Sequence, residues 1–336
     1  MPSFERDSNR IVIGGASSLL GAELKSLLEE SRFAGWDLRL VDEEVVAGTL
    51  TEAGGEPTVI QPVEEGSFEK ARLIFFTGSF AFTLANFETA RRSGAVVIDL
   101  SGHAISFANA FVWYPGREKL KGQAFPAKPQ LAAVPSAAAE GIARLSLALH
   151  QFGLKHMAAI VLQPISAAGK SGIEELETQS KQLLSFQSPG KALFDVQVAF
   201  NSLDRFGPAS GFELNQARLT LRNELSACLR DEGVLPSVNL VHVPVFHGVT
   251  FAACANLDNG VDKQKISDAC QLGGFAILDE LGTGPNNISA ASETVVQLSK
   301  PKADSLQPGS WWFWGAADNI RLPAWNAVKL AEKLVP

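Results

Sequence analysis

The stretch Ala133-Val134-Pro135-Ser136-Ala137-Ala138-Ala139-Glu140-Gly141 joins a short apolar run to the start of a helical pattern. Ser136 stands directly before that pattern and can cap the helix with its hydroxyl. Apolar residues then recur with the spacing of one helix face, at Ala138, Ile142, Leu145 and Leu149. In an α/β protein, the joint between a strand end and a helix start opens onto a crevice in which ligands bind. The sequence therefore centres a candidate site on this joint.

Upstream of this joint, short apolar runs alternate with helical patterns. The runs are Ile11–Ile13, Leu38–Val41, Leu73–Phe76, Val96–Leu100 and Leu131–Val134. Strands that alternate with helices in this way predict an α/β fold with a doubly wound parallel sheet. Downstream, the helix that Ser136 opens and the long apolar strand at 156–162 begin a second domain.

The composition excludes several classes of protein. The 336 residues are enough for two domains with cores of their own, and the net charge of −7 argues against nucleic acid or an anionic membrane as partner. Cys228, Cys254 and Cys270 have no metal-ligand spacing and are too few for a disulfide framework, so we expect no metal site. No apolar run reaches 18 residues, and residues 1–10 are polar and charged. We therefore expect a cytoplasmic protein with neither a membrane span nor a signal peptide.

A turn that contains glycines, Gly14–Gly21, lies between the first strand and the first helix. This is the context in which a dinucleotide turn occurs, with the pyrophosphate at the helix N-terminus. A tight strand-to-helix turn without a ligand explains the same pattern, so both interpretations stay open. The candidate cofactor contacts of the turn are Gly15, Ser17, Ser18, Leu19, Leu20 and Gly21.

Asp42-Glu43-Glu44 follows the second strand, at the place where an acidic residue binds the ribose of adenosine. Asp42 is therefore a further candidate contact to the cofactor. Because neighbouring carboxylates repel a 2′-phosphate, NAD is favoured over NADP if a dinucleotide binds. The alternative is a solvated acidic turn.

Several segments together resemble the aspartate-semialdehyde dehydrogenase family. They are residues 133–141, the loop 162–172 with the helix start at 173–177, Val198-Ala199-Phe200-Asn201, residues 241–250 and residues 318–328. The resemblance implies a Rossmann-type doubly wound parallel sheet over residues 1–132, completed by a C-terminal helix at 316–336. It also implies an α+β substrate and dimerisation domain over residues 133–315, through which the chain forms a homodimer.

The catalytic side chains of that family are missing from this sequence. An Asn-Cys-Ser/Thr sequence opens the family's helix with a nucleophilic cysteine, and Ala137 holds the position of that cysteine here. Val249 holds the position of the acid/base histidine. His247, two residues earlier, lies on the same side of an extended strand and is a candidate substitute. Gln163 matches the family glutamine that helps to orient the substrate. Ser136 has no base placed beside it by the sequence, so its hydroxyl is not activated.

Three more substrate contacts of the family also lack their side chains. His242 and Ile105 match the positions of two arginines. Ala217 matches a glutamate that lies seven residues before Glu224, with the register uncertain by a residue or two. His103 lies close to Ile105, but a lone loop histidine is usually a polar surface residue.

The resemblance also bears on the cofactor. Gly15 and Gly21 match the first and last glycines of the family's turn, whereas Ser18 replaces the middle glycine. Its side chain narrows the approach to a pyrophosphate, although its hydroxyl could also donate to one. The loop at Gly78 and the segment that contains Asn319 resemble further nucleotide contacts. Glu43 and Val45 replace the Ser and Arg of the family's 2′-phosphate loop, which again favours NAD.

Three hypotheses follow. The first is a non-catalytic paralogue, similar to the Usg-type proteins of this family, which keep the fold and have eroded sites. The second is an oxidoreductase of altered chemistry that uses NAD or NADP on an aldehyde, as semialdehyde dehydrogenases do in amino-acid biosynthesis. The third is an active semialdehyde dehydrogenase in which one of the three cysteines is a displaced nucleophile. Affinity for NAD would favour the second hypothesis over the first.

Overall fold

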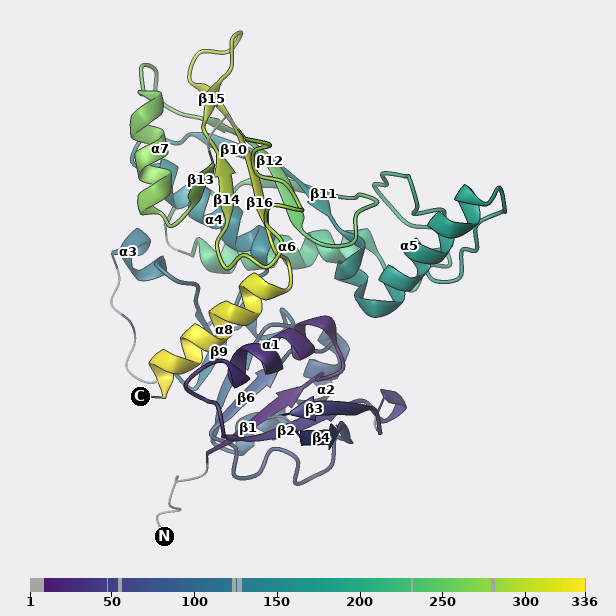
Figure 1. Cartoon of the computed structure of the whole chain (residues 1–336). Helices are drawn as coiled ribbons and strands as arrows, with labels where there is room; N and C mark the ends of the chain where they lie inside the picture. Colours follow the sequence, from purple (N-terminus) through teal and green to yellow (C-terminus); the bar gives the residue numbers. More distant parts are fainter. Residues whose placement is uncertain are drawn as a thin grey trace. The chain divides into compact units, whose positions relative to one another are not determined.

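The structure, a computed structural model, describes residues 9–46, 48–53, 56–122, 125, 129–230, 232–278 and 282–335. It contains two compact units (Figure 1). The first consists of Met1–Tyr114, Phe125–Pro135 and Pro323–Pro336, and the second consists of Pro115–Ala124 and Ser136–Leu322. In this division, residues 115–124 and 316–322 are grouped with the second unit and residues 133–135 with the first.

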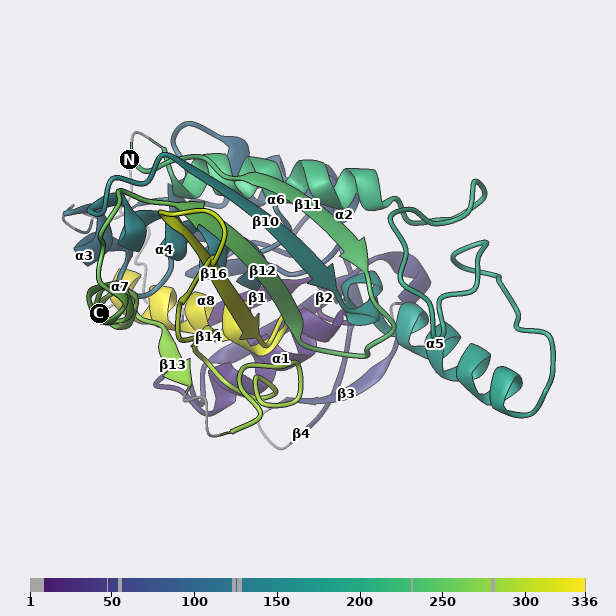
Figure 2. The ribbon, with the colours of Figure 1, turned by 90° about the horizontal axis from the view of Figure 1, so that it is seen from above.

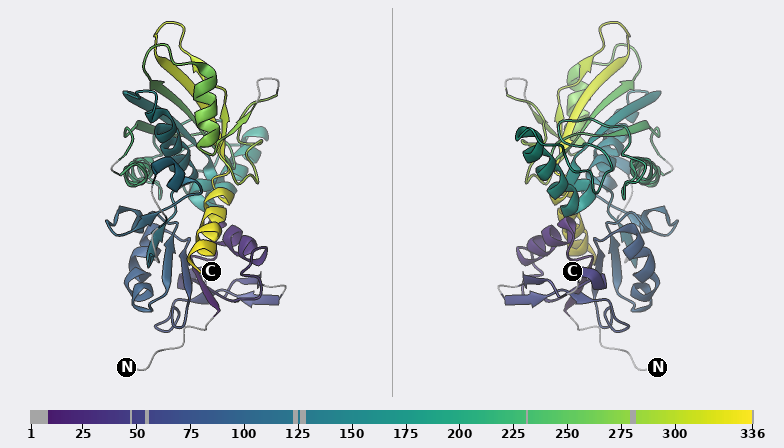
Figure 3. Two further views of the ribbon diagram at one scale, coloured as in Figure 1. Left: turned by 90° about the vertical axis from the view of Figure 1, so that its left-hand side faces the viewer. Right: turned by 90° about the vertical axis from the view of Figure 1, so that its right-hand side faces the viewer.

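The first unit alternates strands with helices along the chain. Its elements are β1 (Arg10–Gly14), α1 (Leu19–Glu29), β2 (Asp37–Asp42), η1 (Glu44–Val46), β3 (Leu50–Ala53), β4 (Glu56–Val59), β5 (Gln61–Pro62), β6 (Leu73–Phe76), α2 (Phe80–Arg92), β7 (Val96–Asp99), η2 (Ala104–Ser106), β8 (Phe111–Val112), β9 (Leu131–Ala133) and most of α8 (Arg321–Leu334). Seven strands form one sheet in the order β5-β2-β1-β6-β7-β9-β8, with every neighbouring pair parallel. The β3–β4 hairpin forms a separate two-stranded sheet (Figure 3).

Both faces of the parallel sheet are apolar, because helices cover both. On β1, Ile11 and Ile13 face the core shared with α1 and α8, whereas Val12 faces the core shared with α2. This accounts for the continuous apolar runs from which the doubly wound sheet was predicted. The prediction of the fold class is confirmed. The strand order reverses beside β1, so the carboxyl ends of β1 and β6 mark the position at which such sheets bind ligands.

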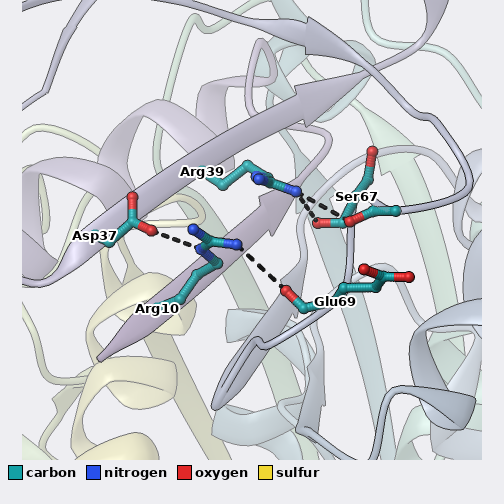
Figure 4. A network of polar contacts seen from close by, with 6 residues as sticks. Arg10, Asp37, Arg39, Ser67 and Glu69 are labelled. Atoms are coloured by element: carbon teal, nitrogen blue, oxygen red, sulfur yellow. Dashed lines mark hydrogen bonds and ion pairs between the residues drawn. The ribbon is translucent and has the colours of Figure 1, made fainter. Parts of the chain in front are cut away.

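A polar network fixes the opposite, amino-terminal end of these strands (Figure 4). Arg10 of β1 forms an ion pair with Asp37 of β2 at 2.5 Å and donates to the carbonyl of Glu69 at 3.4 Å. Arg39 donates to the carbonyl of Ser67 at 3.2 Å. The network joins two strands to the loop before β6 with hydrogen bonds to main-chain carbonyls.

The second unit contains a mixed sheet. Its elements are α3 (Arg117–Lys121), α4 (Ala137–His150), β10 (His156–Gln163), η3 (Ile165–Ala168), α5 (Gly169–Leu184), α6 (Leu214–Cys228), β11 (Ser237–His242), β12 (Val249–Asn256), α7 (Lys263–Leu272), β13 (Ala276–Leu278), β14 (Gln297–Ser299), β15 (Lys302–Ala303) and β16 (Ser310–Ala317). The strand order is β11-β10-β12-β16-β14-β13, and β15 pairs with β16. Figure 2 shows β11, β10, β12 and β16 side by side. Within the described part of the chain, no helix is long and apolar enough to cross a lipid bilayer.

One face of this sheet packs on α4, which lies between α6 and α7. The contact is close because glycines face the aromatic ring of Phe251 on β12. A Cβ atom on Gly315 of β16 would lie 2.2 Å from this ring, and a Cβ atom on Gly141 of α4 would lie 3.0 Å from it. The ring therefore occupies the space that two side chains would need.

We expect Gly315→Ala to destabilise the protein by about 1–3 kcal/mol, because the ring of Phe251 has to move within a packed core. Urea unfolding followed by circular dichroism measures the change. Gly211→Ala is the matched control, since no atom lies within 4 Å of its added methyl. Equal midpoints for the two variants would show that the contact with Phe251 is not tight.

Candidate functional site

The helix α4 begins at Ala137, the position that the resemblance assigns to a nucleophilic cysteine. Ser136 is the N-cap residue, and its Oγ accepts a hydrogen bond from the N–H of Ala139 at 3.4 Å. The side chain of Ala137 is 2% exposed. A methyl group has no electron pair with which to attack a carbonyl carbon. Ala137 therefore adds apolar surface to the start of the helix and no reactivity.

Glu224 of α6 is the partner of Ser136. Its Oε1 accepts from the Ser136 N–H at 3.0 Å, and its Oε2 accepts from the Ser136 hydroxyl at 2.5 Å. The expectation that no base lies near this hydroxyl is therefore wrong. The Ser136 hydroxyl thus donates to Glu224 while it accepts from the Ala139 N–H, and the carboxylate holds the capping residue in place. The two residues are 88 positions apart, and no local pattern of the sequence pairs them.

A buried ion pair supports α4 one turn further along. Glu140 and Arg144 are separated by 2.7 Å, with side chains 1% and 6% exposed. The guanidinium also donates to the carbonyl of Gly273 at 2.7 Å and to the carbonyl of Pro115 at 2.6 Å. Because these acceptors lie after α7 and before α3, the pair fixes the first half of α4 between two other segments of the second unit.

Gln163 and Asn319 are the polar candidates at the carboxyl end of the second unit's sheet. Gln163 ends β10 in register with His242 of β11, and it is half-buried. Asn319 follows β16; its Oδ1 accepts from the N–H of Gly248 at 2.8 Å, and its Nδ2 donates to the hydroxyl of Ser166 at 3.0 Å. Asn319 therefore joins three loops of this unit, a structural use of a residue that was predicted to contact the cofactor.

His247 does not share a strand face with Val249. Val249 is the first residue of β12 and is 4% exposed, whereas His247 is exposed and lies in a bend. Gly248 between them has φ +84°, so the backbone is not extended at this point. Residues two apart point to the same side only in an extended strand. The inference that the two side chains point to the same side is therefore wrong. A Cβ atom on Gly248 would lie 2.6 Å from the carbonyl of Asn287, so a glycine is required here.

His242 lies among apolar side chains and provides no positive charge at neutral pH. It is 1% exposed, and its ring lies 5.6 Å from the ring of Phe206. Burial lowers its pKa to about 4, although a hydrogen bond with the Val198 backbone acts in the opposite direction. A neutral imidazole cannot replace an arginine that holds a substrate carboxylate. Among the described residues, no group of three or more His, Cys, Asp or Glu could hold a metal ion.

None of the three cysteines has the environment of a nucleophile. Cys228 and Cys270 are fully buried, and burial raises the pKa of both thiols, that of Cys270 to about 12. Cys254 lies in the middle of β12, where desolvation raises its pKa as well. A catalytic cysteine needs a lowered pKa, because the thiolate is the nucleophile. The hypothesis of a displaced nucleophile therefore has no support from these thiols.

In the first unit, the turn between β1 and α1 is tightly folded. Gly15 has φ +81°, and a Cβ atom on it would lie 2.1 Å from the backbone nitrogen of Gly78. Ser18 caps α1: its Oγ accepts from the N–H of Gly21 at 2.9 Å and donates to the carbonyl of Thr77 at 2.9 Å. The hydroxyl proton of Ser18 is thus used in the bond to Thr77. The structure gives no support to the alternative that this hydroxyl donates to a pyrophosphate. Leu19 and Leu20 open the helix, where N–H groups have no acceptor within the helix.

Asp42 is bonded to this turn. It ends β2 with 6% exposure, its Oδ2 accepts from the N–H of Ser17 at 2.7 Å, and its Oδ1 accepts from the N–H of Glu43 at 2.8 Å. Glu43 and Glu44 are exposed. The interpretation as a solvated acidic turn therefore fits the two glutamates, whereas the carboxylate of Asp42 orients the glycine-containing turn.

His103 is enclosed by aromatic rings after β7. Its ring centroid lies 4.9 to 5.2 Å from those of Phe80, Phe87 and Phe107, and the residue is 8% exposed. The expectation of a polar surface histidine is wrong, because the neighbouring phenylalanines come from α2 and from the loop after η2. Ile105 is 1% exposed and packs away from solvent. The loop that would carry a phosphate-binding arginine is therefore filled by apolar contacts.

Comparisons with known proteins agree with the geometry of both units. Residues 146–322 match the sequence profile described as the semialdehyde dehydrogenase dimerisation domain. Over 332 residues the chain is 28% identical to a protein of Azotobacter vinelandii named USG-1 protein homolog, with 97% of each chain covered. It is 23% identical over 332 residues to aspartate-semialdehyde dehydrogenase 2 of Vibrio cholerae, again covering 97% of each. A solved structure, a probable aspartate-semialdehyde dehydrogenase from Pseudomonas aeruginosa, matches with a TM-score of 0.85 at 24% identity, over 98% of this chain and 99% of that one.

Because the pKa of His242 is about 4 in the folded state and about 6.5 when unfolded, acid should destabilise the protein through this group. Between these values the unfolded chain binds a proton that the folded chain excludes, so the free energy of unfolding decreases by up to about 1.4 kcal/mol per pH unit on acidification. We expect His242→Phe to show a shallower decrease between pH 6.5 and pH 4 in urea unfolding. His150→Gln, at an exposed histidine, should keep the slope of the unsubstituted protein. An unchanged slope in His242→Phe would contradict the burial of a neutral imidazole.

Proposed function

The chain belongs to the semialdehyde dehydrogenase family, and we propose that it is a member without dehydrogenase activity that forms a homodimer and retains a site for a nicotinamide dinucleotide. In the relatives named as dehydrogenases, the name refers to aspartate semialdehyde. The similarity to a USG-1 protein homolog, at 28% identity, supports placement beside the Usg-type paralogues.

One observation carries the proposal of inactivity: the first residue of α4 is a buried alanine, at the position where the resemblance requires a thiol. Oxidation of an aldehyde by this route has three requirements. A thiol must form a covalent thiohemiacetal, an acid/base group must move protons, and positively charged side chains must hold the substrate. Val249 at the acid/base position is buried and aliphatic, and His242 at an arginine position is uncharged at neutral pH. Gln163 alone cannot supply these functions.

The cofactor site we propose lies on the turn after β1. The first N–H groups of α1, at Leu19 and Leu20, would bind the pyrophosphate, since a helix N-terminus favours an anion. Asp42 would accept from the adenosine ribose and hold Ser17 at the same time. The φ value of Gly15 and its contact with Gly78 fit a dinucleotide turn, in which a glycine permits the tight bend. A bound dinucleotide would accept or donate a hydride. The alternative function is therefore an oxidoreductase that uses this cofactor on a different aldehyde.

The homodimer follows from the family domain, whose description names dimerisation. The three unpaired cysteines fit a reducing compartment, which supports the proposal that the dimer acts in the cytoplasm.

We expect the purified protein to give no reduction of NAD or NADP with aspartate semialdehyde and phosphate beyond that of a heat-inactivated sample. Absorbance at the wavelength of the reduced nicotinamide measures the rate. Cys228→Ser, Cys254→Ser and Cys270→Ser should behave like the unsubstituted protein. Turnover that one of these three substitutions abolishes would overturn the proposal and identify a displaced nucleophile.

For the cofactor, we expect calorimetric titration to show binding of NAD that is tighter than that of NADP. Glu43 is exposed and negatively charged, so Glu43→Gln should raise the affinity for NADP by about fivefold and leave NAD nearly unchanged. Glu30→Gln is the matched control, because it removes the same charge at an exposed position at the end of α1 opposite the turn. Absence of binding for both dinucleotides would contradict the cofactor site, and tighter binding of NADP would contradict the preference for NAD.

A further inference from the structure

We propose that Ser136 is a nucleophile that takes up acyl groups from carboxylic esters, with Glu224 as the base that removes its hydroxyl proton. The observation that carries this inference is a direct hydrogen bond between the hydroxyl of an exposed serine and a buried carboxylate. The chemistry goes beyond the proposed function and is separate from dehydrogenation. It requires neither a thiol at position 137 nor a nicotinamide dinucleotide, because no hydride is transferred.

The two side chains are placed as a nucleophile and its base. Oγ of Ser136 lies 2.5 Å from Oε2 of Glu224, the distance of a charge-assisted hydrogen bond between a hydroxyl and a carboxylate. The other carboxylate oxygen, Oε1, accepts from the Ser136 N–H at 3.0 Å, so the carboxylate is held in its orientation toward the hydroxyl. Glu224 is 5% exposed, whereas Ser136 is exposed. The base is therefore shielded from water, and the residue that carries the nucleophilic oxygen is open to solvent.

Helix capping alone does not account for this arrangement. A capping serine needs only an oxygen that accepts from a backbone N–H. Ser18 and Ser79 cap α1 and α2 in this way at 2.9 Å and 3.0 Å, and the hydroxyl of Ser18 donates to a carbonyl. At Ser136 the capping bond is 3.4 Å long. The oxygen of Ser136 therefore lies much closer to a proton acceptor than to the N–H that it caps.

The start of α4 supplies N–H groups for the negative charge that develops in the reaction. Ser136 follows the strand β9 and directly precedes Ala137, the first residue of the helix. Where a nucleophilic serine stands between a strand and a helix, the N–H of the next residue stabilises the oxyanion. The N–H groups of Ala137 and Ala138 belong to the first turn, for which a helix provides no acceptor of its own. The helix dipole favours a negative charge at the same place.

Buried cations lie near Glu224. Burial raises the pKa of the Cys228 thiol, one turn further along α6; Glu224 raises it as well, whereas Arg117 and Lys121 of α3 lower it. One thiol thus lies close to the carboxylate and to both cations. Arg117 and Lys121 are 8% and 6% exposed. Their charges offset that of the carboxylate in an environment where an isolated anion would be unfavourable.

The reaction has two balanced steps. In the first, Oγ of Ser136 bonds to the carbonyl carbon of the ester and its proton moves to Glu224; the C–O bond then breaks, and the leaving alcohol takes that proton. In the second, Glu224 takes a proton from water, whose oxygen bonds to the acyl carbon, and Ser136 leaves with the proton. The products are a carboxylic acid and an alcohol. Because a carboxylate is ordinarily a weaker base than imidazole, we expect slow turnover and a preference for esters of acidic alcohols such as phenols.

Diisopropyl fluorophosphate tests the Ser136–Glu224 pair, since an activated serine displaces its fluoride. We expect intact mass to show one diisopropylphosphoryl group per chain, and peptide mapping should locate it on Ser136. Ser136→Ala should abolish labelling. Glu224→Gln keeps an acceptor for the Ser136 N–H but removes the base, so it should slow labelling about 100-fold. Glu213→Gln is the matched control: it removes the same charge at the exposed start of α6 and should keep the rate.

With p-nitrophenyl acetate, the protein should release p-nitrophenolate and carry the acetyl group on Ser136. Absence of a phosphoryl label, a label on another serine, or an equal labelling rate in Glu224→Gln would overturn the proposal. A label on Ser136 without acetyl transfer would overturn the ester as substrate class.

Circular dichroism checks the folding of each variant, because Glu224 also holds the start of α4. If Glu224→Gln does not fold, the comparison is made within the unsubstituted protein. Ser136 should then be labelled about 100-fold faster than Ser188, an exposed serine in a loop, and equal rates would overturn the proposal. The assay with aspartate semialdehyde measures reduction of NAD or NADP, so the failure of either proposal is seen independently of the other.

Discussion

The carboxylate of Glu224 holds the start of α4, and much of the second unit depends on that contact. It accepts hydrogen bonds from both the backbone N–H and the hydroxyl of Ser136, so the second half of α6 fixes the N-cap of α4. The Glu140–Arg144 pair then binds the next turn of α4 to the segments around Pro115 and Gly273. With α4 fixed at these points, the face of the helix that carries Gly141 packs closely against Phe251 of the sheet. Polar contacts thus position α4, and its apolar packing against the sheet depends on that position.

The fold could be predicted from the sequence because its signals are local and repeated. Buried parallel strands appear as unbroken apolar runs, and the covering helices appear as apolar residues at helical spacing. The substitutions Ala137 and Val249 were also visible, because each stands within a motif that aligns on both sides. Such information depends on neighbours in the sequence, which the fold keeps together.

The parts of the site that were not predicted depend on contacts between distant residues or on a single backbone angle. Ser136 and Glu224 are brought together by helix packing, and the aromatic cage of His103 is assembled from α2 and a later loop. Because Gly248 has a positive φ, the side chain of His247 does not point to the side that an extended strand would give it. Alternation of side chains is a reliable guide only where the backbone stays extended.

The burial of His242 limits which side chains its strand position can hold. Its neutral ring is packed against Phe206 and shielded from water, and the position is part of the apolar core. A guanidinium at this position would have to be buried without a matched anion, which costs several kcal/mol. An arginine introduced here alone would therefore destabilise the folded chain, whatever it contributed to holding a carboxylate. Restoring a cation at this strand position would require substitutions in the neighbouring core as well, such as at Phe206.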